Sequence, residues 1–149
     1  MQHGIFKKGA YTITTNTDDL DIKMIHQYLS EESYWSKGIP LETVAKSIKN
    51  SLNFGVYTET QQIGFARVIT DKATMAYLCD VFIIKEFQKK GLSSWLMEII
   101  MEYSELQGLK RWILLTSSAD WLYEKHGFSA LEQPAIYMEK WNKINYKNV

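Results

Sequence analysis

The segment Met75–Gln107, MAYLCDVFIIKEFQKKGLSSWLMEIIMEYSELQ, decides the fold of this chain. Tyr77–Ile84 is a nearly unbroken apolar run that is rich in β-branched and aromatic residues and too short for a helix, so it predicts a strand buried on both faces. After Gly91, apolar residues recur at helical spacing with serine and glutamate between them, which predicts an amphipathic helix. The segment therefore indicates a strand, a glycine turn and a helix.

The turn Gln88–Ser93 has features of an anion-binding site. Glycine at the start of a helix permits unusual backbone dihedrals, and the first helical turn leaves N–H groups unpaired at the positive end of the helix dipole. Lys89 and Lys90 add positive charge. Such a turn can hold a phosphate or pyrophosphate, but the same arrangement also occurs in α/β domains that bind no ligand.

Length and charge narrow the functional classes. The 149 residues suffice for one domain and are too few for two. Because 17 basic residues balance 17 acidic ones, we expect neither a nucleic-acid partner nor binding to an anionic membrane. No stretch is long enough to span a membrane and Met1–Ala10 lacks the apolar core of a signal peptide, so we expect a cytoplasmic protein. The scattered histidines and single cysteine predict no metal site.

The first half of the chain predicts two helices and a hairpin. We expect a loose leader before a first strand at Tyr11–Thr15, a helix over Asp19–Glu31 and a second helix opened by Pro40. The hairpin strands are Asn53–Glu59 and Ile63–Thr70, and within the latter Arg67 is expected to be a surface charge.

The second half predicts a crossover unit. A short apolar strand at Trp112–Leu115 comes after the central helix, and a strand, helix and strand in this order favour parallel pairing. A short helix over Ala119–His126 and a last strand near Ile136–Lys140 complete the prediction. We therefore predict one α/β (α+β) domain with a mixed, mostly antiparallel sheet of about six or seven strands, flanked by about four helices.

Two motifs resemble the GNAT superfamily of acyl-CoA-dependent N-acetyltransferases. Gln88–Ser93 resembles its Q/R-x-x-G-x-G/A signature, with Ser93 where the family has Gly or Ala, and WLYEKHGF at Trp121–Phe128 is similar to its late helix and turn. The resemblance implies a single N-acetyltransferase domain over residues 1–149, with a core of about 11–141. It further implies acetyl transfer from acetyl-CoA, as co-substrate, to a primary amine by direct attack in a ternary complex. The aromatic residues at Tyr34 and Trp35 favour a small acceptor.

The resemblance also implies a route for acetyl-CoA. In the family the fourth and fifth strands splay apart and leave backbone groups for the pantetheine arm. By resemblance these groups belong to Phe82, Ile83 and Ile84. The pyrophosphate and the remainder of the arm would be bound by Gln88, Lys89, Lys90, Gly91, Leu92, Ser93, Ser117, Ser118 and Asp120.

Tyr123 and Asp80 are the candidate catalytic residues. Tyr123 matches the family tyrosine that donates a proton to the departing thiolate, and its alternative role is to anchor a short helix. Asp80 is a carboxylate in an apolar strand and could be a general base or a structural acceptor. Glu31 and Glu32 are weaker candidates for the general base. Alternatively, a chain of water molecules could remove the proton, and no side chain would then be needed. Cys79 is expected to be a small buried residue, with thiol catalysis as the alternative.

The segment Glu31–Pro40, which follows the first predicted helix and is called the aromatic loop below, is the candidate acceptor site. By resemblance Tyr34, Trp35 and Glu31 would bind the amine, and the alternative is packing of the loop onto the sheet. Two rival functions remain: a catalytically silent CoA-binding or sensing module, and a mononucleotide-binding domain. The oligomeric state is open, and a homodimer is compatible with the sequence.

Overall fold

The structure is a computed structural model that describes residues 2–146, and its central element is one sheet. Within these residues six strands lie in chain order: β1 (Ile5–Lys8), β2 (Tyr11–Thr14), β3 (Leu52–Tyr57), β4 (Gln62–Thr70), β5 (Met75–Ile83) and β6 (Arg111–Leu114). All neighbours pair antiparallel except β5 and β6, which are parallel. The predicted mixed, mostly antiparallel sheet is confirmed.

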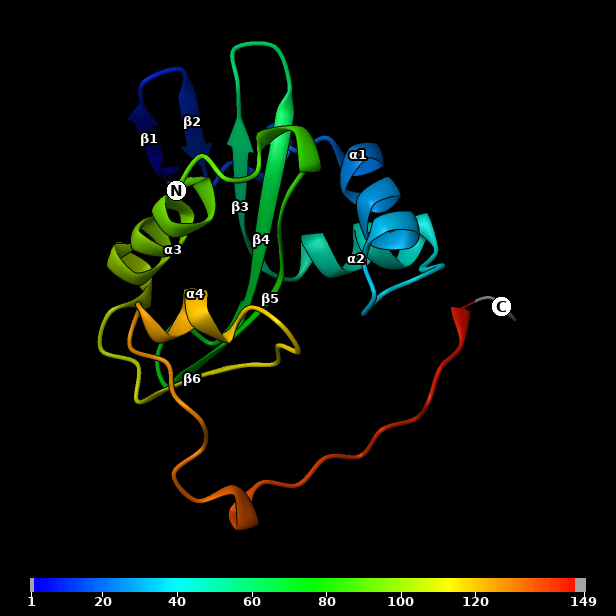
Figure 1. Ribbon diagram of the computed structural model, residues 1–149, viewed down its shortest axis with the longest axis vertical. Coiled ribbons are helices and arrows are strands. Elements are labelled where there is room, and N and C mark those ends of the chain that lie inside the picture. The colour runs from blue at the N-terminus through cyan, green and yellow to red at the C-terminus, as the bar shows by residue number, and fades with distance from the viewer. Residues whose placement is uncertain (1, 147–149) are drawn as a thin grey trace.

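Helices cover both faces of the sheet, with α1 (Ile22–Gln27) and α2 (Leu41–Lys49) on one side and α3 (Leu92–Glu102) and α4 (Asp120–Glu124) on the other (Figure 1). Strand residues alternate between faces. Accordingly Ile83 packs in the cluster beneath α3 and α4, whereas its neighbour Phe82 packs in the cluster beneath α1 and α2. This double burial explains the continuous apolar run of β5.

Residues 5–8 form a strand, contrary to the expected loose leader. β1 forms a hairpin with β2, and Gly9, at a φ of +58°, occupies the turn between them. Phe6 makes an edge contact with the ring of Tyr103, at 6.4 Å between centroids. The prediction failed because β1 has only four residues and Phe6, its one partly buried residue, packs against the distant Tyr103.

The first helix begins later than predicted. The carboxylate of Asp21 accepts a hydrogen bond from the N–H of Met24 at 3.0 Å, and this cap starts α1 at Ile22. The predicted helix then continues as a π-helical turn, Tyr28–Glu32, which delivers the chain to the aromatic loop.

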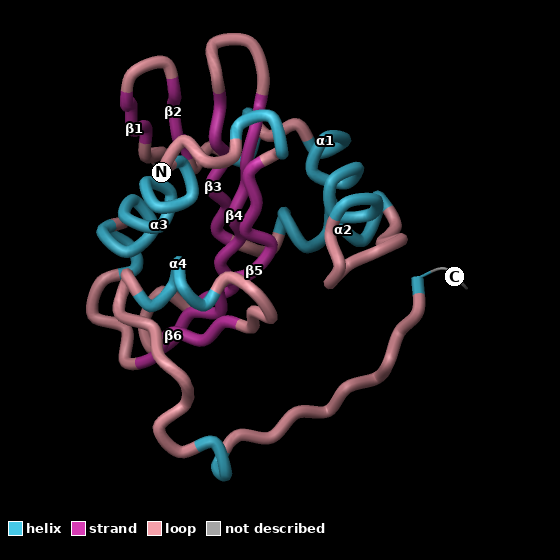
Figure 2. The backbone as a smooth tube through the Cα atoms, in the orientation of Figure 1, coloured by secondary structure: helices cyan, strands magenta, loops and turns pink. Residues whose placement is uncertain are grey.

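The predicted strand near Ile136–Lys140 is wrong. That region contains the short helical turn Pro134–Ile136 and, after it, extended chain without strand pairing. Figure 2 shows this segment as a long loop that leaves α4, passes β6 and runs outside the body toward α2. None of the helices in the described part of the chain is long and apolar enough to cross a membrane.

The interface between α3 and the sheet should carry much of the stability. Leu96 is completely buried there, so we expect Leu96→Ala to lower the free energy of unfolding by about 2–5 kcal/mol through lost contacts and a cavity. Urea denaturation measures this change. Glu98→Ala, on the exposed side of the same helix, is the control and should change the value by less than about 0.5 kcal/mol.

Candidate functional site

The turn before α3 is shaped by two residues with positive φ. Lys89 has a φ of +62°, and Gly91, the residue that precedes the helix, has a φ of +76°. The side-chain amide of Gln88 donates a hydrogen bond to the carbonyl of Ile83 at 2.8 Å and thereby ties the turn to the end of β5. Lys89 and Lys90 are exposed.

The backbone donors of this turn are not used inside the fold. Across the described residues, the N–H groups of residues 89–94 donate no hydrogen bond to the protein. The first N–H of the helix that is bonded within the fold is that of Trp95, which donates to the carbonyl of Gly91 at 3.1 Å. Helix-start N–H groups carry partial positive charge and need an acceptor. The turn can therefore bind an anionic group through its main chain.

β5 and β6, the last two strands of the sheet, diverge partway along β5. Their parallel pairing covers Met75–Leu78 against Arg111–Leu114, and β5 then continues to Ile83 with no described strand on this edge. This is the predicted splay of the family's fourth and fifth strands.

A bulge accompanies the divergence. Phe65 pairs with Phe82 and Arg67 with Cys79, so Asp80 and Val81 together face one residue of β4. Asp80 has a φ of +53°, which is rare for a residue other than glycine and bends the strand at this point.

The gap between the strands is a cleft with a volume of about 760 Å³. It is walled by the diverging strands, the aromatic loop, the segment between β6 and α4, and one residue of the C-terminal segment. Its lining residues are Tyr34, Trp35, Ser36, Arg67, Ile69, Tyr77, Leu78, Cys79, Asp80, Val81, Leu114, Leu115, Thr116, Ser117, Ser118, Ala119, Tyr123 and Trp141.

Backbone groups of β5 face this open edge, but they do not all belong to the residues predicted to bind the pantetheine arm, Phe82, Ile83 and Ile84. The N–H of Ile84 donates to the carbonyl of Ile63 of β4 at 2.9 Å and is already used. Since backbone groups alternate in direction along a strand, Phe82 also points toward β4, whereas Val81 and Ile83 point away from it. The prediction is therefore corrected: main-chain groups of Val81 and the N–H of Ile83, rather than groups of Phe82 and Ile84, are open to a ligand on this edge, since the carbonyl of Ile83 already accepts from Gln88.

Tyr123 lies at the cleft on α4, with its side chain buried beneath the surface. Burial, together with a smaller effect of the nearby Tyr34, raises the pKa of Tyr123 to about 12. The phenol therefore remains protonated at neutral pH and can donate a hydrogen bond into the cleft. Its ring also contacts Phe128 edge-on, at 6.1 Å between centroids, which fixes its orientation.

Asp80 is held by two donors. Its Oδ2 accepts a hydrogen bond from Nε of Arg67 at 2.8 Å, and its Oδ1 accepts one from Nε1 of Trp35 at 2.9 Å. Arg67 also donates to the hydroxyl of Ser51 at 3.1 Å. The expectation that Arg67 is a surface charge is wrong: it is partly buried and neutralises the one carboxylate among the described residues that line the cleft.

The aromatic loop is fastened across the cleft by a second contact. The N–H of Ser117 donates to the hydroxyl of Tyr34 at 3.2 Å, and hydrogen bonds from Ser117 lower the pKa of Tyr34. Tyr34 and Trp35 pack edge to face at 5.0 Å between centroids. Both side chains remain partly exposed, so the loop forms a wall of the cleft and is not packed into the core.

Two predicted site residues, Glu31 and Asp120, do not line the cleft, and Glu31 is exposed. Cys79, expected to be a small buried residue, is partly buried and lines the cleft, where burial raises its pKa to about 12 and keeps the thiol protonated. Tyr77 and Trp141 are cleft residues that sequence reasoning missed. Only the approach of distant segments reveals them, since neither belongs to a recognisable motif.

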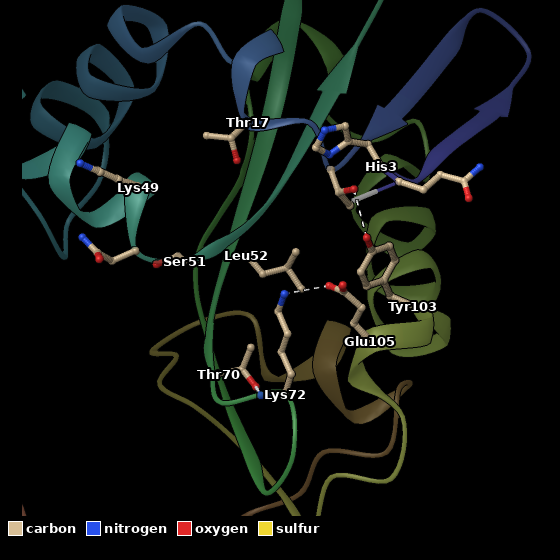
Figure 3. A pocket seen from close by; sticks show the side chains of 12 residues that line it. His3, Thr17, Lys49, Ser51, Leu52, Thr70, Lys72, Tyr103 and Glu105 are labelled. Carbon is tan, nitrogen blue, oxygen red and sulfur yellow. Dashed lines mark hydrogen bonds and ion pairs between the residues drawn. The ribbon is translucent and has the colours of Figure 1, made fainter.

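Figure 3 shows a second, smaller hollow of about 300 Å³, which none of the predicted site residues lines. Its Lys72 and Glu105 pair with each other at 3.0 Å, and the hydroxyl of Tyr103 is 3.2 Å from that of Thr15. Because these polar groups satisfy one another, we place the candidate site in the larger cleft. No group of three or more potential metal ligands occurs among residues 2–146.

Comparison with known proteins identifies the family. The sequence model of the acetyltransferase (GNAT) domain matches residues 49–130, which include the bulged strand, the glycine turn and Tyr123. A Gibberella zeae protein named as a candidate acetyltransferase is 30% identical over 141 residues, covering 80% of this chain and 78% of that protein.

Solved structures agree with this assignment. The crystal structure of a GNAT-family protein from Xanthomonas campestris is 40% identical and superposes with a TM-score of 0.89, over 96% of this chain and 99% of that one. A candidate acetyltransferase from methicillin-resistant Staphylococcus aureus is 26% identical, with a TM-score of 0.71 over 88% and 98% of the two chains. The chain therefore belongs to the GNAT family of acetyltransferases.

Proposed function

We propose that this protein transfers the acetyl group of acetyl-CoA to the primary amine of a small acceptor, by direct attack within a ternary complex. The proposal rests on the observation that three features adjoin one another in the structure. Unused N–H groups around Gly91 lead to the open edge of β5 at Ile83 and Val81, and this edge leads to the cleft that contains Tyr123.

Each feature suits one part of acetyl-CoA. The main-chain donors of residues 89–94 would bind the pyrophosphate, with Lys89 and Lys90 near its outer oxygens. The N–H of Ile83 and the main chain of Val81 would hydrogen-bond the pantetheine arm as an added strand does. Ser117 and Ser118, on the opposite wall, would contact the same arm from the segment that precedes α4.

The reaction then requires no covalent enzyme intermediate. The nitrogen lone pair of the acceptor attacks the thioester carbonyl, the C–N bond forms, and the C–S bond breaks to release a thiolate. A main-chain N–H at the bulge would stabilise the developing oxyanion. Tyr123 would stabilise the thiolate by a hydrogen bond, since a thiol pKa near ~8.5 makes full proton transfer from a phenol of pKa about 12 unfavourable.

The cleft walls suggest the chemistry of the acceptor. Tyr34, Trp35, Tyr77 and Trp141 supply aromatic surface, and Asp80 is the single carboxylate among the described lining residues, paired with the single arginine. The Oδ1 of Asp80 is held only by Trp35, whose loop is exposed, so an acceptor ammonium could replace this donor and pass its proton to Asp80 or to water. We therefore propose a small amine with an apolar or aromatic body.

Gly91 provides a test of acetyl-CoA binding. We expect Gly91→Ala to weaken acetyl-CoA binding at least about 10-fold, because alanine is strained at a φ of +76° and a change in φ would disturb the anion-binding turn. Titration calorimetry measures the affinity. Gly108→Ala is a matched control, since Gly108 has nearly the same φ, +77° against +76°, and equally open surroundings, but lies after α3. Equal loss of affinity in both variants would contradict the assignment.

Tyr123 provides a test of the chemical step. We expect Tyr123→Phe to lower kcat about 100-fold with little change in the KM for acetyl-CoA, because the hydroxyl acts only as the thiolate forms. A thiol-release assay measures both. Tyr77→Phe removes a phenol from the same cleft and should leave kcat within about 3-fold. Since the pKa of Tyr123 is about 12, ionisation of Tyr123 should cause no loss of wild-type activity below about pH 10.

Asp80 provides a test of acceptor binding. We expect Asp80→Asn to lower kcat/KM for the amine about 100-fold while acetyl-CoA affinity is unchanged, because the charge that receives the ammonium is lost. Trp35→Phe, which removes only the competing N–H donor, should retain at least a third of the wild-type value. Full activity in Asp80→Asn would assign Asp80 a purely structural role. Melting temperatures establish that each variant is folded at the assay temperature.

One observation favours a second function, binding of CoA without turnover. Both oxygens of Asp80 already accept hydrogen bonds, so no carboxylate among the described cleft residues is available as a base without rearrangement. Tight acetyl-CoA binding without thiol release across a panel of small amines, polyamines, amino acids and peptides would select this sensing function. A larger thermal shift with ATP than with acetyl-CoA would contradict both proposals.

A further inference from the structure

Side chains of β4 and β5 that point to one face of the sheet form a floor of the cleft. Arg67 and Ile69 are alternate residues of β4, so their side chains share a face. Tyr77 of β5 pairs with Ile69 and points to the same side. Arg67 also pairs with Asn53 of β3, whose side chain donates to the carbonyl of Ile48 in α2 at 2.8 Å. The floor therefore lies on the face that α1 and α2 cover.

Part of this floor is apolar and open. Ile69 is 46% exposed, whereas the neighbouring Val68, on the opposite face, is completely buried. Tyr77 is partly buried, and both residues line the cleft below the aromatic loop. We call Ile69 and the ring of Tyr77 the apolar floor. Apolar surface within a cleft favours a ligand with an apolar group of its own.

The apolar floor adjoins a pair of opposite charges. Arg67 and Asp80 are the only charged residues among the described residues that line the cleft, and they neutralise each other at 2.8 Å. Arg67 donates from Nε to Asp80 and from Nη1 to Ser51, and its remaining N–H groups have no acceptor within the described chain. The Oδ1 of Asp80 is held by Trp35 alone. The pair therefore combines open donors with an acceptor whose partner can be exchanged.

We propose that the acceptor is a free α-amino acid with a large apolar side chain, an inference that rests on the proposed acetyl transfer. Its ammonium group replaces Trp35 on Oδ1 of Asp80, and its carboxylate binds the open N–H groups of Arg67. Its side chain covers the apolar floor. An α-amino acid carries both charges on one carbon, which matches a carboxylate and a guanidinium in direct contact.

Other classes of amine match the cleft less well. A polyamine or an aminoglycoside carries several positive charges, and Asp80 is the single carboxylate among the described lining residues. A second ammonium would therefore lie unpaired beside Arg67, which is unfavourable. An amine without a carboxylate would leave the open donors of Arg67 without an acceptor in a partly buried position. A zwitterion satisfies both charges of the pair.

The transfer step balances for this acceptor. The ammonium gives one proton to Asp80 or to water, and the nitrogen lone pair attacks the thioester carbonyl. The C–N bond forms and the C–S bond breaks, and the thiolate takes up the proton that the new amide nitrogen releases. The products are an N-acetyl amino acid and CoA with a free thiol. Acetylation removes the positive charge that binds Asp80, which weakens product binding and promotes release. Arg67 contributes specificity, because it holds a group that takes no part in bond making.

The first test compares amino acids with amines of the same side chain. Thiol release at saturating acetyl-CoA is measured for L-phenylalanine, L-tryptophan and L-leucine, and for phenethylamine, tryptamine and isoamylamine, which lack the carboxylate. For the best pair, kcat/KM of the amino acid should exceed that of its amine by about 10–100-fold, the contribution of hydrogen bonds to a charged group. Glycine and spermidine should both react more slowly than the best amino acid.

The outcomes separate this inference from the proposed function. Amines that react as fast as their amino acids, or faster release with glycine or spermidine, would overturn the amino-acid acceptor and leave acetyl transfer standing. No thiol release with any amine would contradict acetyl transfer itself, and the inference with it.

The second test assigns the carboxylate contact to Arg67. Arg67→Gln should bring the ratio of kcat/KM between amino acid and matching amine to within about 3-fold of unity, because only the amino acid loses a contact. The ratio cancels any effect on Asp80 that both substrates share. Arg111→Gln is the matched control, since Arg111 is exposed at the start of β6 and does not line the cleft, and its ratio should equal that of the wild type. An unchanged ratio in Arg67→Gln would refute the assignment.

The third test addresses the apolar floor and does not depend on the folding of the Arg67 variant. Ile69→Ala should lower the preference for phenylalanine over glycine by about 5-fold, because apolar contact area is lost. Ile5→Ala, at another exposed strand position outside the cleft, should leave this preference unchanged. Equal preferences in both variants would place the amino-acid side chain elsewhere and refute the proposed orientation. Melting temperatures establish that each variant is folded at the assay temperature.

Discussion

The candidate site depends on the early separation of β5 from β6, which pair only over Met75–Leu78 and Arg111–Leu114. A strand in the middle of a sheet satisfies its backbone groups on both sides, whereas β5 beyond Leu78 is paired on one side only. This leaves the N–H of Ile83 and the main-chain groups of Val81 directed into open space, while the carbonyl of Ile83 is bound by Gln88. The divergence thus creates both a cleft and a row of donors and acceptors along its wall, without any special side chain.

The bulge at Asp80 joins this backbone arrangement to the electrostatics of the cleft. An extra residue in β5, with a φ of +53°, places the Asp80 carboxylate beside Arg67 of β4. A carboxylate with 8% side-chain exposure needs such a partner, since a buried unpaired charge is very unfavourable. The remaining oxygen binds Trp35 and thereby positions the aromatic loop, so one strained residue organises three separate segments.

Much of the fold and part of the site arise from local patterns. The β5–α3 unit, the hairpin of β3 and β4 and the helix after Pro40 are predictable because apolar periodicity and turn residues are local properties. The N–H groups before α3 are predictable because every helix leaves its first donors unpaired. The motif around Tyr123 identifies this residue, but its burial and its pKa of about 12 arise from packing between α4, Phe128 and the aromatic loop.

By itself the sequence determined the order of most strands and helices, the glycine turn, and the family resemblance at Gln88–Ser93 and Trp121–Phe128. These properties depend on residues that are close neighbours in the chain. Only the tertiary structure decided that Arg67 neutralises Asp80 and that Val81 and Ile83 face the open edge. It also decided that the segment Ile136–Lys140 has no strand partner within residues 2–146. Each of these depends on register and on contacts between distant segments, which hydrophobic pattern and turn chemistry do not encode.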